Sequence, residues 1–127
     1  MAVLAPCHLR ALIDDRGGFT VDPRSGTAVH RGVSVCLEPD LSISFARSAW
    51  RDETIHDWLA IRAGSLAQRR RFLGGWIDRR TNRVWLDVVH VLPGSARPFA
   101  VALARRRGQH CVYDLGQRQV VLTGGVP

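Results

Sequence analysis

The segment GGWIDRRTNRVWLDV, residues 74–88, decides the fold of this chain. Apolar and polar residues alternate on both sides of RRTN, which is typical of two antiparallel strands joined by a tight turn. A four-residue loop separates two faces, one apolar and one aromatic and charged: Ile77, Val84, Leu86 and Val88 against Trp76, Asp78, Arg83, Trp85 and Asp87. A three-residue loop would mix these faces, so the pattern predicts the four-residue register, with Asn82 in the left-handed conformation.

The rest of the chain surrounds this hairpin with further hairpins and helices. Its 127 residues suit one domain. We expect an α+β fold, with a mainly antiparallel sheet built from hairpins and two main helices packed on one face. The expected elements are a short helix within 3–15, N-terminal strands within 15–45, a helix over 53–70, the hairpin over 75–91, a helix over 96–107 and a C-terminal hairpin over 110–122.

Local signals set the expected ends of these elements. Asp52 can cap the first main helix, whose apolar stripe is Ile55, Trp58, Leu59 and Leu66. Ser95 can cap the second, whose stripe is Ala96, Phe99, Ala100 and Leu103. Gly116-Gln117 has the chemistry of a two-residue hairpin turn.

The stretch GGFTVDPRSGTAV, residues 17–29, is a looser copy of the central hairpin. Asp22 and Gly26 match Asp78 and Asn82 when the turns are aligned. The preceding aromatic residue, however, is shifted by one position, which would place it on the opposite face. The likeness of the two segments has two alternative explanations, an internal duplication or turn chemistry that the two hairpins share.

Composition limits the classes of partner. The formal net charge is +7 and every one of the 18 basic residues is arginine, a balance that favours a polyanionic partner. No apolar stretch is long enough for a membrane span, and the start lacks the pattern of a signal peptide, so we expect a cytoplasmic protein. Three widely spaced cysteines, Cys7, Cys36 and Cys111, suit reduced thiols.

Arginines cluster at three places, 69–71, 79–83 and 105–107. If the ends of the two helices and the hairpin loop meet, they form an arginine rim that can hold phosphates, beside tryptophans that can stack on bases. The alternative is that these arginines only complement helix dipoles in solvent. The residues expected to bind nucleic acid, or an acidic or nucleoprotein partner, are Arg79, Arg80, Arg83, Arg105, Arg106, Trp76 and Trp85.

An enzymatic alternative is a metal-independent ribonuclease toxin. It would use His56 or His90 as a general acid or base, with Arg83 stabilising the charged phosphate. No pair of histidines has a diagnostic spacing. No cysteine or histidine pattern predicts a metal site, and no glycine motif predicts a nucleotide cofactor.

The C-terminal half resembles small proteins of actinobacterial phages, plasmids and integrated elements. The resemblance rests on LGGWIDRRTNRVWLDVVHV, ARPFAVALARRRGQHCVYDL and VLTGG within residues 73–125. Gln117 and Arg118 stand where such proteins are often acidic. The resemblance implies a mobile-element, phage-related context, including anti-defence roles, and it supplies no catalytic or binding residue. We therefore expect a small non-enzymatic binding protein. A homodimer that uses the Trp76/Trp85 face as its interface is the remaining alternative.

Overall fold

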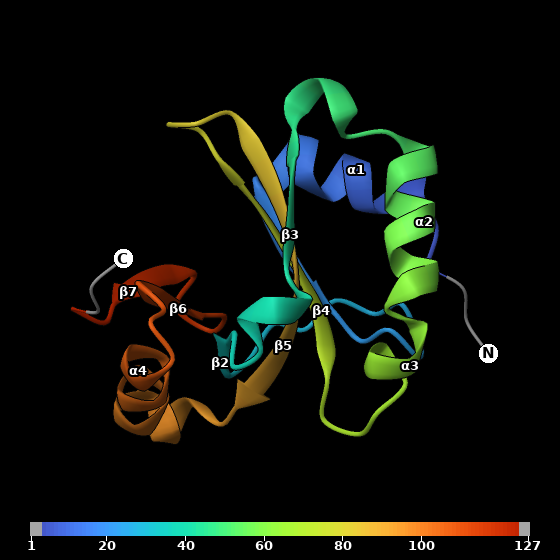
Figure 1. Ribbon diagram of the computed structural model, residues 1–127. Helices are drawn as coiled ribbons and strands as arrows, with labels where there is room; N and C mark the ends of the chain where they lie inside the picture. The colour runs from blue at the N-terminus through green and yellow to red at the C-terminus, as the bar shows by residue number, and fades with distance from the viewer. Residues whose placement is uncertain (1–3, 125–127) are drawn as a thin grey trace.

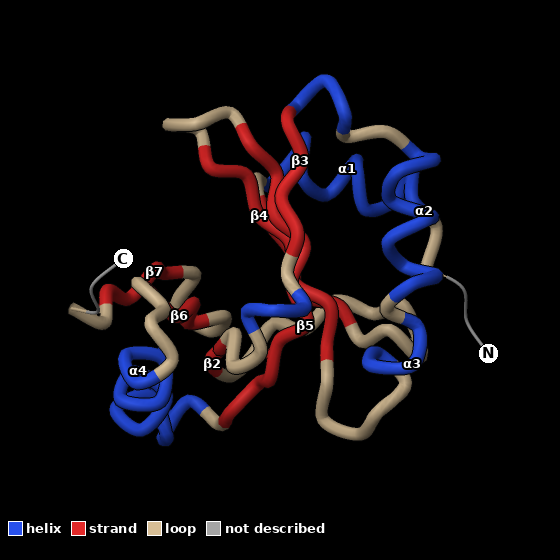
Figure 2. The backbone as a smooth tube through the Cα atoms, viewed as in Figure 1, coloured by secondary structure: helices blue, strands red, loops and turns tan. Residues whose placement is uncertain are grey.

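The computed structural model describes residues 4–124. The chain forms an α+β fold in which a curled antiparallel sheet carries all of its helices on one side (Figures 1 and 2). The strands are β1 Gly18–Val21, β2 Val33–Val35, β3 Ile43–Ala46, β4 Phe72–Asp78, β5 Arg83–Leu92, β6 Cys111–Asp114 and β7 Gln119–Leu122. The helices are α1 Pro6–Arg16, α2 Asp52–Ile61, α3 Ala63–Leu66 and α4 Arg97–Arg106, with short 3₁₀ turns η1 Pro39–Leu41, η2 Arg47–Ala49 and η3 Gly94–Ala96.

Strand β5 holds the two parts of the sheet together. The strand order is β1-β4-β5-β2-β6-β7, and β3 also pairs with β5. The first part of β5 pairs with β4 and β3, whereas its last three residues pair with β2. Strand β2 in turn pairs with β6, and β6 pairs with β7. The sheet curls along this series of strands, so one of its faces is concave (Figure 1).

The central hairpin has the register that the sequence predicts. Trp76 pairs with Trp85, and Asp78 pairs with Arg83 across a four-residue loop. Asn82 ends the loop in the left-handed conformation, with φ 56°. The side chains of the apolar face are buried in the core, with Val84, Leu86 and Val88 at 0% exposure. The alternation of side chains therefore determined the register.

Three loops of the sheet share one turn design. Asp22, Asp78 and Asp114 each precede a loop and accept a backbone hydrogen bond from within it. The last loop residue is left-handed in each, at Gly26, Asn82 and Arg118 with φ 73°, 56° and 53°. The two-residue turn predicted at Gly116-Gln117 is therefore wrong. The Asp114 carboxylate accepts from the Gln117 amide at 2.9 Å and holds a four-residue loop over 115–118.

The helix expected over 53–70 is shorter and broken. It begins at Asp52, ends at Ile61 and is followed by the single turn of α3. Asp52 does not cap it but lies in its first turn, where it pairs with Arg10 at 2.9 Å. Gly64 weakens the continuation, and the chain leaves the helix so that Leu66 can be buried and β4 can begin.

The second main helix begins one residue later than expected. Ser95 lies in the 3₁₀ turn before α4 and makes no cap. The buried stripe is formed by Ala100 and Ala104, and Phe99 is 60% exposed, so its predicted core position is wrong. Ala100 and Ala104 lie four residues apart on one face of α4, where their small side chains let the helix approach the sheet closely. The larger Phe99 side chain is then turned away from the sheet.

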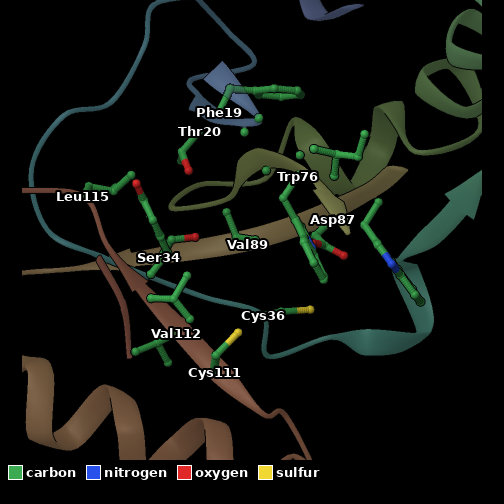
Figure 3. A pocket seen from close by; sticks show the side chains of 18 of the residues that line it. Phe19, Thr20, Ser34, Cys36, Trp76, Asp87, Val89, Cys111, Val112 and Leu115 are labelled. Carbon is green, nitrogen blue, oxygen red and sulfur yellow. The ribbon is translucent and has the colours of Figure 1, made fainter. Parts of the chain in front are cut away.

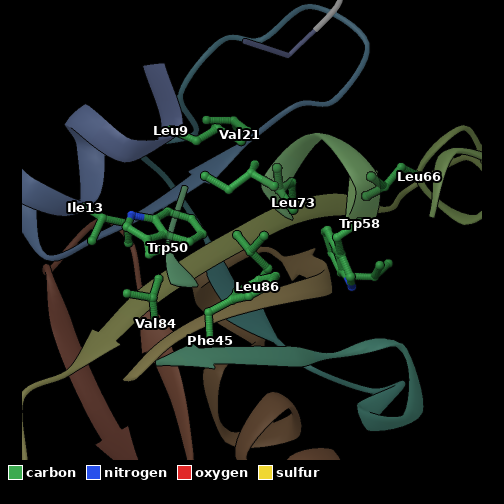
Figure 4. Close-up of a cluster of buried hydrophobic side chains, with 12 residues drawn as sticks. Leu9, Ile13, Val21, Phe45, Trp50, Trp58, Leu66, Leu73, Val84 and Leu86 are labelled. Atoms are coloured by element: carbon green, nitrogen blue, oxygen red, sulfur yellow. The ribbon is translucent and has the colours of Figure 1, made fainter. Parts of the chain in front are cut away.

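Two hydrophobic clusters fill the convex side of the sheet. The larger lies between α1, α2 and the strands β1, β3, β4 and β5; its members include Leu9, Ile13, Trp50, Ile55, Trp58, Leu73 and Leu86 (Figure 4). The smaller lies beneath α4 and contains Val33, Val35, Ala100, Ala104 and Val112. The helices on one face, as the sequence predicts, leave the concave face without helical cover. Within residues 4–124, no helix combines the length and apolarity needed to cross a bilayer.

Candidate functional site: a cleft on the concave face

The concave face of the sheet encloses a cleft of about 1390 Å³ (Figure 3). Residues of β4 and β5 line one part of the cleft, and residues of β6 and β7 line another. Its lining contains four aromatic side chains, Phe19, Trp76, Trp85 and Tyr113. Small-molecule pockets are commonly roughly 300–1,000 Å³, so this open space suits an extended chain better than a compact ligand.

The floor of the cleft carries a pair of stacked tryptophans. The rings of Trp76 and Trp85 lie with centroids 6.2 Å apart and planes 9° from parallel. Trp76 is 43% exposed. The residue paired with it on β1 is Gly18, which has no side chain to cover the indole. The pair therefore offers a flat aromatic surface to the cleft.

A partly buried carboxylate lies beside this aromatic pair. Asp87 follows Trp85 on the same face of β5 and lies next to Trp76 in Figure 3. Burial raises the pKa of Asp87 above the ordinary aspartate value, while hydrogen bonds donated by Ser42 and Trp76 act in the opposite direction. The Asp87 carboxylate thus interacts with the indole of Trp76.

Basic side chains border the cleft. Arg16 belongs to the last turn of α1, Arg80 to the β4–β5 loop and Arg118 to the β6–β7 loop. All three are exposed. His30 and His110 also line the cleft. Three exposed guanidinium groups thus belong to the same lining as the carboxylates and the aromatic rings.

The structure separates the residues that the sequence placed on one arginine rim. Trp76, Trp85 and Arg80 line the cleft, but the other predicted binding residues lie outside its lining. Arg79 lies beside Gly17, the C-cap of α1. Arg83 donates to the Ser44 side chain and backbone at 2.9 and 3.1 Å.

The two arginines predicted from α4 stand in its last turn. Arg105 donates to the Thr123 carbonyl at 2.6 Å, which ties the helix to the end of β7. Arg106 is exposed in the same turn. The neighbouring Arg107 donates to the Leu37 carbonyl at 3.1 Å. Part of this cluster therefore holds backbone segments together.

The third arginine cluster, 69–71, is far from the hairpin loop. It precedes β4, whereas Arg79 and Arg80 follow it, and the length of this strand separates the two groups by roughly 25 Å. Arg71 instead binds both oxygens of Glu38, with two contacts of 2.8 Å. The expectation that the three clusters meet on one rim is therefore wrong.

The residues of the ribonuclease alternative are also apart. His56 is 75% exposed on α2 beside Asp57. His90 lies near Glu38 and Arg71, and burial lowers its pKa although Glu38 acts to raise it. His90 is seven positions beyond Arg83 on β5, roughly 23 Å along the strand. Within residues 4–124, no group of three or more histidines, cysteines or carboxylates is placed to hold a metal ion.

Several cleft residues were not singled out from the sequence. Arg118 and Tyr113 come from the C-terminal hairpin, and Cys36 and Cys111 lie together at the β2–β6 junction. Alternation along β5 had placed Asp87 on the correct face. The curl that brings β6 and β7 opposite that face had no signal in the sequence, because it depends on distant strand pairing.

Comparison with protein-family models, curated proteins and solved structures finds no match. The mobile-element context suggested by the resemblance therefore stays a prediction.

Proposed function

We propose that the concave face binds single-stranded nucleic acid without cleaving it. The observation that carries the proposal is the exposed Trp76/Trp85 stack on the floor of a cleft bordered by arginines. Bases of a single strand stack on aromatic side chains whatever their sequence, and each contributes roughly 1–3 kcal/mol. A duplex buries these base faces, so we expect it to bind less tightly.

The distribution of charge in the cleft supports one orientation of a bound strand, with its bases toward the carboxylates and its phosphates toward the arginines. Arg16, Arg80 and Arg118 are exposed residues of the lining, where they can contact the phosphates of a bound strand. Asp78 and Asp87 are in the lining beside the tryptophans. Phosphates would be repelled there, whereas the amino edges of bases can donate hydrogen bonds to carboxylates. A strand bound with its bases inward and its phosphates outward therefore satisfies both the carboxylates and the arginines.

The backbone at Arg118 also supports a binding role. An arginine occupies a left-handed position, φ 53°, where glycine would be less strained. The equivalent positions of the other two loops hold Gly26 and Asn82, which tolerate this conformation. A cost of this kind is often retained at functional positions.

Binding of labelled single-stranded DNA and RNA, and of the matched duplexes, tests the proposal. We expect single strands to bind more tightly than duplexes and to weaken as salt rises from about 50 to about 200 mM, because counterions compete for phosphates. The oligonucleotides should remain intact. Duplex preference, cleavage, or the absence of binding at low salt would each contradict the proposal.

A matched pair of double variants separates cleft binding from net charge. Arg80→Gln with Arg118→Gln removes two charges from the cleft edge. Arg51→Gln with Arg69→Gln removes the same charge from exposed positions outside the lining. We expect the first pair to lose about tenfold or more in affinity and to lower the salt slope by roughly 1.4, about 0.7 per phosphate contact. Equal losses in both pairs would show that only the overall charge matters.

A further inference from the structure

Cys36 follows the last residue of β2, and Cys111 is the first residue of β6. Val33 pairs with Asp114 and Ser34 pairs with Tyr113. The β2–β6 pairing ends at Ser34 and Tyr113, and the same register continued for two residues would place Cys36, just beyond β2, opposite Cys111. Side chains two residues apart share a face, so both cysteines face the cleft, as Ser34 and Tyr113 do. Figure 3 shows both cysteine side chains in the same part of the cleft.

The spacing at this position suits a disulfide. The Leu115 amide donates to the Gly32 carbonyl at 2.8 Å, which makes alternate positions along the ladder hydrogen-bonded pairs. Continued beyond the paired residues, the ladder would put Cys36 and Cys111 in that series, in which Cα atoms are about 5.5 Å apart. Disulfides commonly join Cα atoms roughly 4.4–6.8 Å apart. A bond between the two sulfurs requires Cys36, which lies beyond the end of β2, to take up the spacing of the continued ladder.

We propose that Cys36 and Cys111 form a reversible disulfide across the floor of the cleft. Both are free thiols in this structure. With a peroxide as oxidant, one thiol is oxidised to a sulfenic acid and water leaves as the O–O bond breaks. The second thiol attacks that sulfur, the S–S bond forms and a second water leaves. A thiol reductant reverses the change by exchange.

The surroundings of the two thiols make this oxidation selective for strong or sustained oxidant. Burial and the nearby Asp87 carboxylate raise the pKa of both cysteines. Cys36 also lies 3.5 Å from the Ser42 hydroxyl. Since the thiolate is the reactive form, the raised pKa slows the oxidation of both thiols at neutral pH.

The position of the bond gives it a structural effect. Strand β2 belongs to the part of the sheet that packs on α4, and it pairs with β5, the strand that holds the two parts together. A covalent link between the end of β2 and the start of β6 would fix the curl of the sheet and the width of the cleft. This effect of the disulfide would not depend on what the cleft binds.

Peptide mapping of the full chain carrying Cys7→Ser tests the inference. This variant removes the exposed cysteine of α1, which could otherwise join two molecules. After treatment with hydrogen peroxide, we expect both remaining thiols to disappear together from a monomeric protein. Tryptic peptides 32–47 and 108–118 should then be joined until dithiothreitol is added.

Single-thiol variants provide the control. Cys7→Ser combined with Cys36→Ser or with Cys111→Ser should retain one thiol and form no internal link. The inference is overturned if the Cys7→Ser protein keeps two free thiols under peroxide that oxidises Cys7 in the wild type. Independent oxidation of each thiol, or links only between molecules, would overturn it equally. The test uses the folded Cys7→Ser protein, so poor folding of a control variant would not obscure it.

Discussion

The ring of Phe19 occupies the space that a side chain at Gly75 would need. The two residues are paired across β1 and β4, and a Cβ built at Gly75 would lie 2.4 Å from the Cε2 and Cζ atoms of the ring. Phe19 packs against the main core. The second glycine of the GG pair therefore lets an aromatic ring from the neighbouring strand lie flat on β4.

We expect Gly75→Ala to destabilise the fold. The Phe19 ring must move away from its packed position, and overpacking of this kind costs about 1–3 kcal/mol. Urea denaturation of the variant and wild type measures the free energy of unfolding. The control is Gly94→Ala, where a Cβ meets nothing within 4 Å and where we expect no loss. Equal effects of the two substitutions would contradict the predicted packing.

We expect Asp87→Asn to raise stability at neutral pH. Burial raises the pKa of Asp87 in the folded state, so the folded protein binds this proton more tightly than the unfolded chain. The free energy of unfolding contributed by this group therefore falls as pH rises from the ordinary aspartate value of about 3.9 through the raised folded pKa. Asparagine has no charge to bury, so the fall should disappear in the variant.

Urea titrations across this pH range measure the effect of Asp87→Asn. Wild type and variant should differ least in acid and most at neutral pH, with the variant the more stable. Asp40→Asn, at an exposed position, provides the control. A larger advantage of Asp87→Asn in acid than at neutral pH would show that burial does not dominate at this carboxylate.

Arg118→Gly should change stability and binding in opposite directions. Glycine relieves the left-handed backbone strain at this position, a gain of about 1 kcal/mol. The same change removes one guanidinium from the cleft edge and should weaken oligonucleotide binding severalfold. Asn82→Gly should raise stability less, because asparagine tolerates the left-handed conformation, and it should leave binding unchanged. Thermal unfolding and binding titrations check both effects.

The sequence predicts the parts of this fold that depend on local patterns. Period-two alternation in β4 and β5 yields the register of Trp76 with Trp85, and Asn82 marks the end of the turn. The position of Phe99 could not be predicted, because helical spacing alone does not say which side of α4 meets the sheet. The choice depends on how closely the helix approaches β2 and β6.

The candidate site was predictable only in part for a related reason. Trp76, Trp85 and Arg80 come from one hairpin, whose faces its own sequence defines. Arg118, Tyr113 and the cysteine pair enter the cleft only because the sheet curls between β5 and β6. Long-range strand pairing controls that curl. The grouping of arginines failed because Arg71 and Arg79 lie at opposite ends of β4.

Binding of single-stranded oligonucleotide to Trp76→Ala, compared with Phe99→Ala, tests the account most directly. Both substitutions remove a partly exposed aromatic ring, but only Trp76 lies in the cleft. We expect Trp76→Ala to lower affinity about 5- to 100-fold, the loss of a base stacked on the indole, with folding confirmed by circular dichroism. Phe99→Ala should bind like the wild type. Equal affinities of the wild type and of folded Trp76→Ala would contradict the central claim that the concave face is the binding surface.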